Sequence, residues 1–118
     1  MIRANFEAHV LAGAAQAGVS LSAVQLGQLE RYYELLRHWN RIVNLTALSL
    51  ESYPPQTLDR LLLEPLFAAR FIDAGPVTCI DLGSGGGSPA IPIKIVRPEM
   101  ALSMVEARQR KAAFLREV

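Results

Sequence analysis

The amino-acid sequence predicts an α/β fold in which N-terminal helices precede a single βαβ unit. Two observations lead to this fold class. In the first part of the chain, apolar residues recur every three or four positions, as on one face of a helix, whereas the last part consists of short apolar runs separated by glycine and proline. In that last part the predicted order is strand, glycine-rich loop, helix, strand and helix, as in a doubly wound fold.

The composition fits one globular unit. The chain has 118 residues, of which 51% are hydrophobic and 19% are charged. The net charge of +1 neither indicates nor excludes an RNA partner. The longest apolar stretch, residues 61–72, is interrupted by charged residues and proline and is much shorter than the roughly 20 residues that cross a bilayer, so no membrane span is expected. The single cysteine, Cys79, predicts a buried thiol in a reducing cytoplasm and no cysteine-based metal site.

Two helices are predicted before residue 50. The first covers residues 5–16 and ends before Gly18, which suits a helix C-terminus. Ser22 and Gln25 have the spacing of a capping box, so a long helix should begin there. Its apolar positions recur at helical spacing and should form a packing face that includes both tyrosines and the tryptophan: Leu26, Leu29, Tyr32, Tyr33, Leu36, Trp39 and Val43.

A third helical segment and a turn lead into the βαβ unit. Pro54-Pro55 marks a break, and residues 57–71 are again helical in pattern, with a kink or an end expected at Pro65. Residues 73–76 should form a turn. We place a domain junction at this turn, which divides the chain into an N-terminal helical region, residues 1–74, and a partial cofactor-binding domain, residues 75–118.

The βαβ unit begins with a short apolar run, residues 77–82. The run lacks polar alternation, which predicts a strand of a parallel sheet covered on both faces. Residues 91–96 should form a short helix, residues 101–105 a second strand, and residues 108–118 a further helix.

The residues between the first strand and its helix carry the strongest functional signal. They read Asp-Leu-Gly-Ser-Gly-Gly-Gly-Ser-Pro over residues 81–89. Glycine has no Cβ, so Gly83, Gly85 and Gly87 allow a tight turn and let a ligand lie directly against the backbone. Pro89 suits the first turn of the next helix, where its missing N–H is no loss.

The spacing of this loop separates three ligand classes. A nucleoside-triphosphate loop needs Gly-Lys-Ser/Thr, whereas Gly87 is followed by Ser88 and Pro89. The dinucleotide fingerprint G-x-G-x-x-G would start at Gly83 and requires glycine where Ser88 stands, although a variant with another small residue stays open. The pattern of an acid, a glycine and alternating glycines looks like the first motif of class I (Rossmann-like) S-adenosylmethionine-dependent methyltransferases.

Glu106 supports a bound adenosine. It follows the second predicted strand, about 20 residues past the loop, where an acid can accept hydrogen bonds from the ribose hydroxyls. Both S-adenosylmethionine and NAD contain this ribose, so Glu106 alone does not separate them. Glycine turns and acids at strand ends are often purely structural, but their order and spacing here favour a cofactor site.

Two segments of the sequence match one known family. In RYYELLRHWNRIVNLTAL, residues 31–48, Trp39-Asn40 and the following Asn-Leu-Thr-Ala of residues 44–47 match a pair of family motifs. The segment CIDLGSGGGSPAIPIKIVRPE, residues 79–99, and the later VEARQRKAAFLREV match its cofactor loop and the basic start of the next helix. Over most of residues 21–118 the chain resembles the bacterial 16S ribosomal RNA guanine-N7 methyltransferases, also called glucose-inhibited division protein B.

The resemblance implies roles for particular residues. Gly83 and Ser88 fall where family members contact S-adenosylmethionine, Gly85 and Gly87 shape the loop, Glu106 faces the ribose, and Asp81 holds the methionine end through water. The chain departs from the family at Ser88, usually a larger apolar residue, at Ala90, usually glycine, and over residues 61–66, where the family commonly has histidine and aspartate-serine-leucine.

The implied reaction needs little from side chains. Guanine N7 has a lone pair and no proton, so positioning is the main catalytic contribution, and no catalytic acid or base is nominated. The implied partner is 16S ribosomal RNA or the small ribosomal subunit, whose phosphates could be met by basic residues of the last helix: Arg108, Arg110, Lys111 and Arg116.

Other readings stay open at this stage. Family members are much longer than this chain, and their sheet has more strands than the two predicted here. A truncated, noncatalytic helical module that binds RNA or a partner is therefore an alternative. A nicotinamide-dependent oxidoreductase half-domain is a further one, and binding of NAD in place of S-adenosylmethionine would support it.

Overall fold

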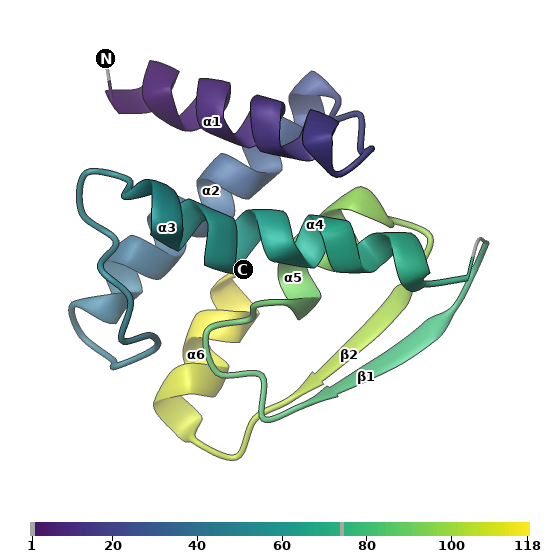
Figure 1. The fold of residues 1–118 in the computed structure, drawn as a ribbon. Coiled ribbons are helices and arrows are strands. Elements are labelled where there is room, and N and C mark those ends of the chain that lie inside the picture. The colour runs from purple at the N-terminus through teal and green to yellow at the C-terminus, as the bar shows by residue number, and fades with distance from the viewer. Residues whose placement is uncertain (1, 74) are drawn as a thin grey trace.

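The structure is a computed structural model that describes residues 2–73 and 75–118, with side chains from residue 4 onward (Figure 1). Within these residues the predicted α/β fold is confirmed. The elements, in chain order, are α1 (Ile2–Gln16), α2 (Ala23–Asn40), α3 (Pro55–Leu58), α4 (Glu64–Ala68), β1 (Thr78–Leu82), α5 (Ala90–Val96), β2 (Ala101–Val105) and α6 (Gln109–Glu117).

The first two helices have the end signals that the sequence predicts. At the end of α1, the Gly18 N–H donates to the Ala15 carbonyl at 3.0 Å and the Val19 N–H donates to the Ala14 carbonyl at 2.8 Å. Gly18 takes a φ of 76°, so this is a Schellman motif that favours glycine. At the start of α2, Ser22 Oγ accepts from the Gln25 N–H and Gln25 Oε1 accepts from the Ser22 N–H, which completes the capping box.

The third helical segment stays continuous around Pro65. A π-helical turn, Asp59–Leu63, joins α3 to α4, and a 3₁₀ turn, Ala69–Phe71, ends the segment. Proline has no N–H and its ring crowds the carbonyl four residues earlier, which here is that of Leu61. The expected disturbance at Pro65 thus takes the form of a wider helical turn directly before it.

The helices share one apolar core. Its largest fully buried side chains include Phe6, Leu29, Leu36, Leu58, Leu62 and Leu66. The predicted packing face of α2 is confirmed, since Tyr32 and Tyr33 are buried and Trp39 packs edge-on against Phe114 of α6, with ring centroids 6.1 Å apart. The core also takes in Ile91 of α5, so the βαβ unit packs directly on the helices.

The two strands pair in parallel, with Thr78 opposite Ala101 and Leu82 opposite Val105. Helix α5 connects them and lies between the sheet and helices α2 and α4 (Figure 1). Arg97, just after α5, donates through Nη1 to the carbonyl of Ile72 at 2.9 Å and so ties the connection to the segment before the sheet.

One face of the sheet is open. Along both strands exposed and half-buried residues alternate. Ile80, Leu82 and Val105 are 63%, 76% and 51% exposed. The prediction of a strand covered on both faces is therefore wrong for this chain, because no described helix packs on that side. Cys79 lies on the covered face but is half-buried, which corrects the expected buried thiol.

The predicted turn at residues 73–76 is only partly described. Ala74 lies outside the described residues, and Gly75 has a φ of 90°, a left-handed conformation that favours glycine. No helix of the described part is long and apolar enough to span a membrane.

Candidate functional site

The glycine loop lies at the edge of the sheet where both strands end. Because β1 and β2 are parallel, their carboxyl ends meet at the same edge. The N–H groups of Gly83 and Ser84 both donate to the carbonyl of Val105, at 2.7 and 3.2 Å. The first residues of the loop therefore close over the end of the second strand, at the place where doubly wound folds bind ligands.

Glu106 and the loop lie together, as their spacing predicts. Glu106 Oε1 accepts from the Gly85 N–H at 2.8 Å, and its Oε2 accepts from the Arg108 N–H at 3.0 Å. These two backbone N–H groups, that of Arg108 first, hold the pKa of the Glu106 carboxyl below its ordinary value of 4.5. The residue is thus an ionised acceptor at neutral pH that links the loop to the start of α6.

The positions of the loop require glycine for different structural causes. Gly83 and Gly85 have φ values of 68° and 52°, and a Cβ on Gly83 would meet open space. A Cβ on Gly85 would have only the Gly83 carbonyl oxygen near it, at 3.9 Å. A Cβ on Gly87 would lie 2.3 Å from Ile91 Cδ1, so Gly87 lets α5 pack against the loop. The surface on which a ligand can lie is therefore formed by Gly83 and Gly85.

Ser88 and Asp81 flank these glycines in the chain. Ser88 Oγ donates to the Leu61 carbonyl at 2.9 Å. In a regular α-helix this carbonyl would accept from the N–H of residue 65, but Pro65 has no N–H. The Ser88 hydroxyl thus anchors the loop to the third helical segment. Asp81 is half-buried at the end of β1, and its backbone carbonyl accepts from Ser84 Oγ at 3.1 Å.

The N-terminal helices supply contacts to the loop that the sequence analysis missed. Tyr32 of α2 donates its hydroxyl to the Gly86 carbonyl at 2.5 Å. Asn40 Oδ1 accepts from the N–H groups of Leu45 and Thr46, at 2.8 and 3.0 Å. The Leu45 carbonyl in turn lies 3.3 Å from where a Cβ of Gly86 would be. The segment of residues 39–47, which carries the matched motif, therefore packs against the glycine loop.

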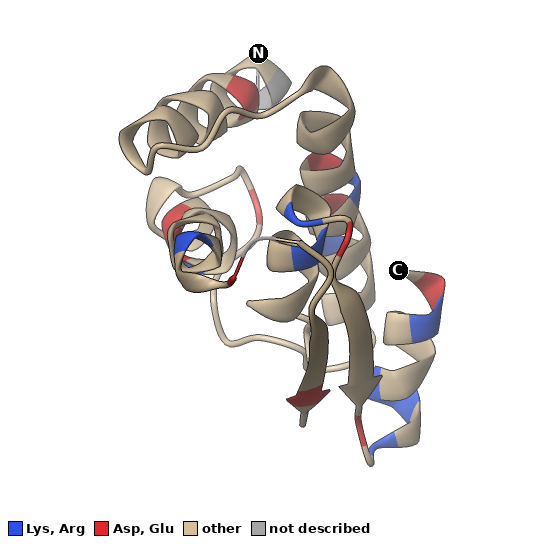
Figure 2. Cartoon of the chain, turned by 90° about the vertical axis from the view of Figure 1, so that its right-hand side faces the viewer, with Lys and Arg blue, Asp and Glu red and all other residues tan. Residues whose placement is uncertain are grey.

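The basic residues of the last helix lie beside this edge. Figure 2 shows Lys and Arg along α6, next to the acidic ends of the two strands. Arg108 and Arg110 are exposed and Lys111 is half-buried, and Arg116, one turn further on, is exposed. Arg108, Arg110 and Lys111 make the start of this helix basic, close after Glu106 in the chain.

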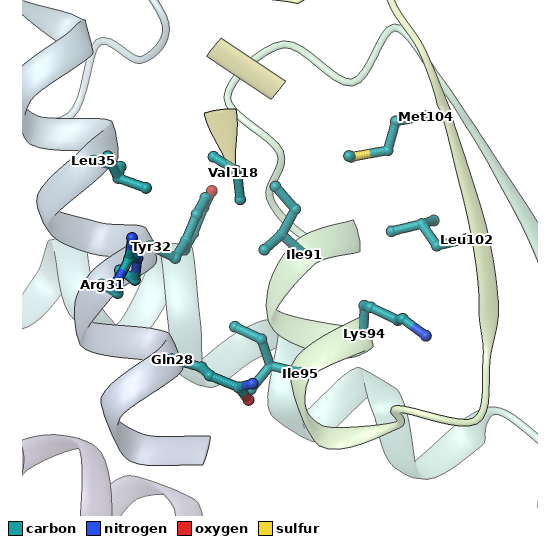
Figure 3. A pocket seen from close by; sticks show the side chains of 10 residues that line it. All are labelled: Gln28, Arg31, Tyr32, Leu35, Ile91, Lys94, Ile95, Leu102, Met104 and Val118. Carbon is teal, nitrogen blue, oxygen red and sulfur yellow. The ribbon is translucent and has the colours of Figure 1, made fainter. Parts of the chain in front are cut away.

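Several hollows of the described part border the βαβ unit, and one of them lies between β2 and α6 and includes Glu106 and Arg116. Two others contact the helical region. One, of about 680 Å³, lies between the loop and the third helical segment and includes Thr46, Arg60, Glu64 and Ser88. The other, of about 430 Å³, lies between α2, α5 and β2 (Figure 3). Its lining is mostly apolar, and its Lys94 already donates to the carbonyls of Pro98 and Met100. We therefore assign the candidate site to the loop and not to this second pocket.

Among residues 2–73 and 75–118, no three His, Cys, Asp or Glu side chains form a group that could hold a metal ion.

A glycine loop at the end of one parallel strand and an acid at the end of the next define the first βαβ unit of a Rossmann-like, methyltransferase-type fold. The family follows from comparison with known proteins. The family model for GidB, rRNA small subunit methyltransferase G, matches residues 25–118, and the chain belongs to this family.

Curated relatives give the same result. The chain is 43% identical over 101 residues to the ribosomal RNA small subunit methyltransferase G of Chloroflexus aggregans, covering 86% of this chain and 41% of the relative. It is 39% identical over 117 residues to that of Laribacter hongkongensis, covering 96% and 52%. For that of Geobacter sp. (strain M21), the identity is 38% over 105 residues, covering 89% and 46%. The chain spans about half the length of these relatives.

Proposed function

We propose that the chain provides the cofactor-binding part of an S-adenosylmethionine-dependent enzyme that methylates guanine N7 in 16S ribosomal RNA. The observation that carries this proposal is the contact between the Glu106 carboxylate and the Gly85 N–H at the end of the parallel strands. The names of the relatives, which are ribosomal RNA small subunit methyltransferases, support the class of substrate. We propose the cytoplasm as its compartment, because a ribosomal RNA substrate is found there.

The residues present fit this cofactor. Each oxygen of a carboxylate can accept two hydrogen bonds, and each Glu106 oxygen accepts one backbone N–H within the chain. One acceptor position per oxygen is left for the two ribose hydroxyls. Gly83 and Gly85 offer bare backbone beside it. As the family resemblance implies, Ser88 would contact the cofactor and Asp81 would hold its methionine end.

The chemistry asks mainly for positioning. The cofactor, when bound, supplies a methyl group on a positively charged sulfur. Guanine N7 attacks with a lone pair and carries no proton, so no side chain needs to act as a base. The work of this chain is to hold the cofactor, through Glu106 and the loop, and to present it at an accessible edge.

The basic start of α6 suits the phosphates of the substrate. Arg108 and Arg110 are exposed at the start of the helix, beside Glu106, and Lys111 follows. Phosphate contacts position a nucleic acid without reading its sequence. We therefore propose these three residues as RNA contacts that place the target nucleotide near the loop.

A second candidate function has one observation in its favour. One apolar face of the described sheet is open, with Ile80 and Leu82 exposed. A noncatalytic module could use this face to bind RNA or a protein partner. Such a module would fold without binding the cofactor, so cofactor binding separates the two candidates.

The first prediction tests the cofactor site. The purified chain, shown to be folded by circular dichroism, is titrated with S-adenosylhomocysteine in a calorimeter, and saturable binding is expected. Gly85→Val should abolish it, because valine at a φ of 52° is strained and its side chain projects into the ligand's space. Gly75→Val is the matched control, since Gly75 also has a positive φ and open surroundings but lies before β1.

Three results would contradict the proposal. A folded wild-type chain without saturable binding would leave the noncatalytic module as the better account. Equal affinity in wild type and Gly85→Val would remove the loop as the site. Binding of NAD in place of S-adenosylhomocysteine would instead favour the nicotinamide-dependent alternative.

A further inference from the structure

The peptide group between Gly86 and Gly87 is held at both of its polar ends. Its carbonyl, on Gly86, accepts from the Tyr32 hydroxyl at 2.5 Å. Its N–H, on Gly87, donates to the Ser84 carbonyl at 2.7 Å. A peptide plane whose carbonyl and N–H both have partners has one preferred orientation.

This peptide group would otherwise rotate easily. It lies in a run of three glycines, and both Gly85 and Gly87 have positive φ values, of 52° and 83°. Glycine has no Cβ to restrict the backbone, so the loop loses more conformational entropy on folding than a loop of other residues would. The orientation of this plane therefore depends on its hydrogen bonds more than on steric limits.

Tyr32 is well placed to hold it. The residue is 2% exposed within the helical core, so packing restricts where its hydroxyl can lie. Burial raises the pKa of Tyr32 well above its ordinary value of 10.0, which keeps the hydroxyl protonated and able to donate. The Leu45 carbonyl and a Leu36 methyl lie 3.3 and 3.4 Å from the position of a Gly86 Cβ, so the loop is seated closely on this side.

We propose that Tyr32 is a positioning residue for the cofactor site: its hydroxyl fixes the Gly86–Gly87 peptide and so pre-forms the loop on which the cofactor lies. This inference rests on the proposed function and deepens it. Preorganisation matters because a loop that must be ordered on binding lowers the apparent affinity by the fraction of molecules in the competent form.

The test compares two tyrosines of the same helix. Tyr32→Phe keeps the ring and removes only the hydroxyl that meets the loop. Tyr33→Phe is the matched control, because Tyr33 is equally buried and its hydroxyl donates at 2.6 Å to the carbonyl of Leu50, outside the loop. Both variants should lose thermal stability to a similar degree, so measurements are made at a temperature where circular dichroism shows both to be folded.

Two readouts follow the loop itself. In Tyr32→Phe, amide hydrogen exchange at Gly87, measured by NMR, should become about tenfold faster, and affinity for S-adenosylhomocysteine should fall about fivefold to tenfold. In Tyr33→Phe both quantities should equal those of the wild type. A role of Tyr32 confined to packing or overall stability would move both variants alike.

The outcomes separate this inference from the proposed function. If the wild type binds and Tyr32→Phe matches it in affinity or in Gly87 exchange, the positioning role is wrong while the proposed function stands. If the folded wild type binds no S-adenosylhomocysteine, the proposed function fails, and the positioning role fails with it.

Discussion

The helical region and the sheet of this molecule differ in how their apolar surfaces are covered. The helices bury theirs against one another and against α5, so that Phe6, Leu62 and Leu66 are fully buried. The sheet covers one face with α5 and leaves Ile80 and Leu82 exposed on the other. In α/β proteins parallel sheets are normally covered on both faces, so this chain leaves open a face that such sheets bury.

The candidate site lies on the border between these two regions. From the helical side, Tyr32 holds the Gly86 carbonyl and the Leu61 carbonyl accepts from Ser88. From the strand side, Glu106 accepts from Gly85, and the Val105 carbonyl accepts from the start of the loop. The well-packed helices therefore support a loop that the two strands alone would hold from one side only.

The largest expected effect tests the difference between the regions directly. Leu62→Ala removes a fully buried side chain from the helical core and should lower the free energy of unfolding by about 2–5 kcal/mol. Leu82→Ala removes the same atoms from the open face of β1 and should change it by less than about 0.5 kcal/mol. Urea denaturation followed by circular dichroism measures both. Equal losses would mean that the open face is covered in solution, for instance by self-association.

A smaller effect is expected in the segment of residues 39–47, which packs against the loop. Asn40→Ala removes the acceptor for the N–H groups of Leu45 and Thr46 and should lower the free energy of unfolding by about 1–2 kcal/mol. Asn44→Ala is the control, because Asn44 is exposed in the same connection, and less than about 0.5 kcal/mol is expected there. The same denaturation measurement applies. If Asn40→Ala behaved like Asn44→Ala, the conformation of this segment would not depend on the Asn40 side chain.

Local signals made the helix ends and the loop predictable from sequence. Ser22 with Gln25, and Gly18, act through backbone groups within a few residues, so their spacing alone predicts the geometry. The meeting of Glu106 with the glycine loop was also predictable, because parallel strands end at the same edge.

Contacts between distant segments were not predictable in this way. Tyr32 lies on an apolar helix face, where the pattern predicts only a packing role for a tyrosine. The Gly86 carbonyl that accepts its hydrogen bond is 54 positions away in the chain. The link from Ser88 to the Leu61 carbonyl depends on the π-helical turn before Pro65, whereas the sequence shows only that a proline disturbs the helix. The open face of β1 escaped prediction because an apolar run does not tell how many helices are present to cover it.

The smallest expected effect concerns the strand side of the border. Glu106→Gln loses the charge and keeps only one of the two acceptor oxygens, because the NH2 group that replaces the other cannot accept from the N–H of Gly85 or Arg108, so the melting temperature at pH 7 should fall by about 2 °C. Glu117→Gln removes the same charge at the other end of α6 and should leave the melting temperature unchanged.

The pH dependence of this difference follows from the direction of the shift. Since the two backbone N–H groups lower the pKa of the folded Glu106 carboxyl below 4.5, its ionised form stabilises the folded chain above that pH, and the stabilisation is lost as the pH falls through the folded pKa. The gap in melting temperature between wild type and Glu106→Gln should therefore be constant from pH 7 to about pH 5 and close below it. A gap that persisted at a pH below the folded pKa, where the Glu106 carboxyl is protonated, would show that the charge of Glu106 does not hold the loop, and would leave the helical side of the border as its main support.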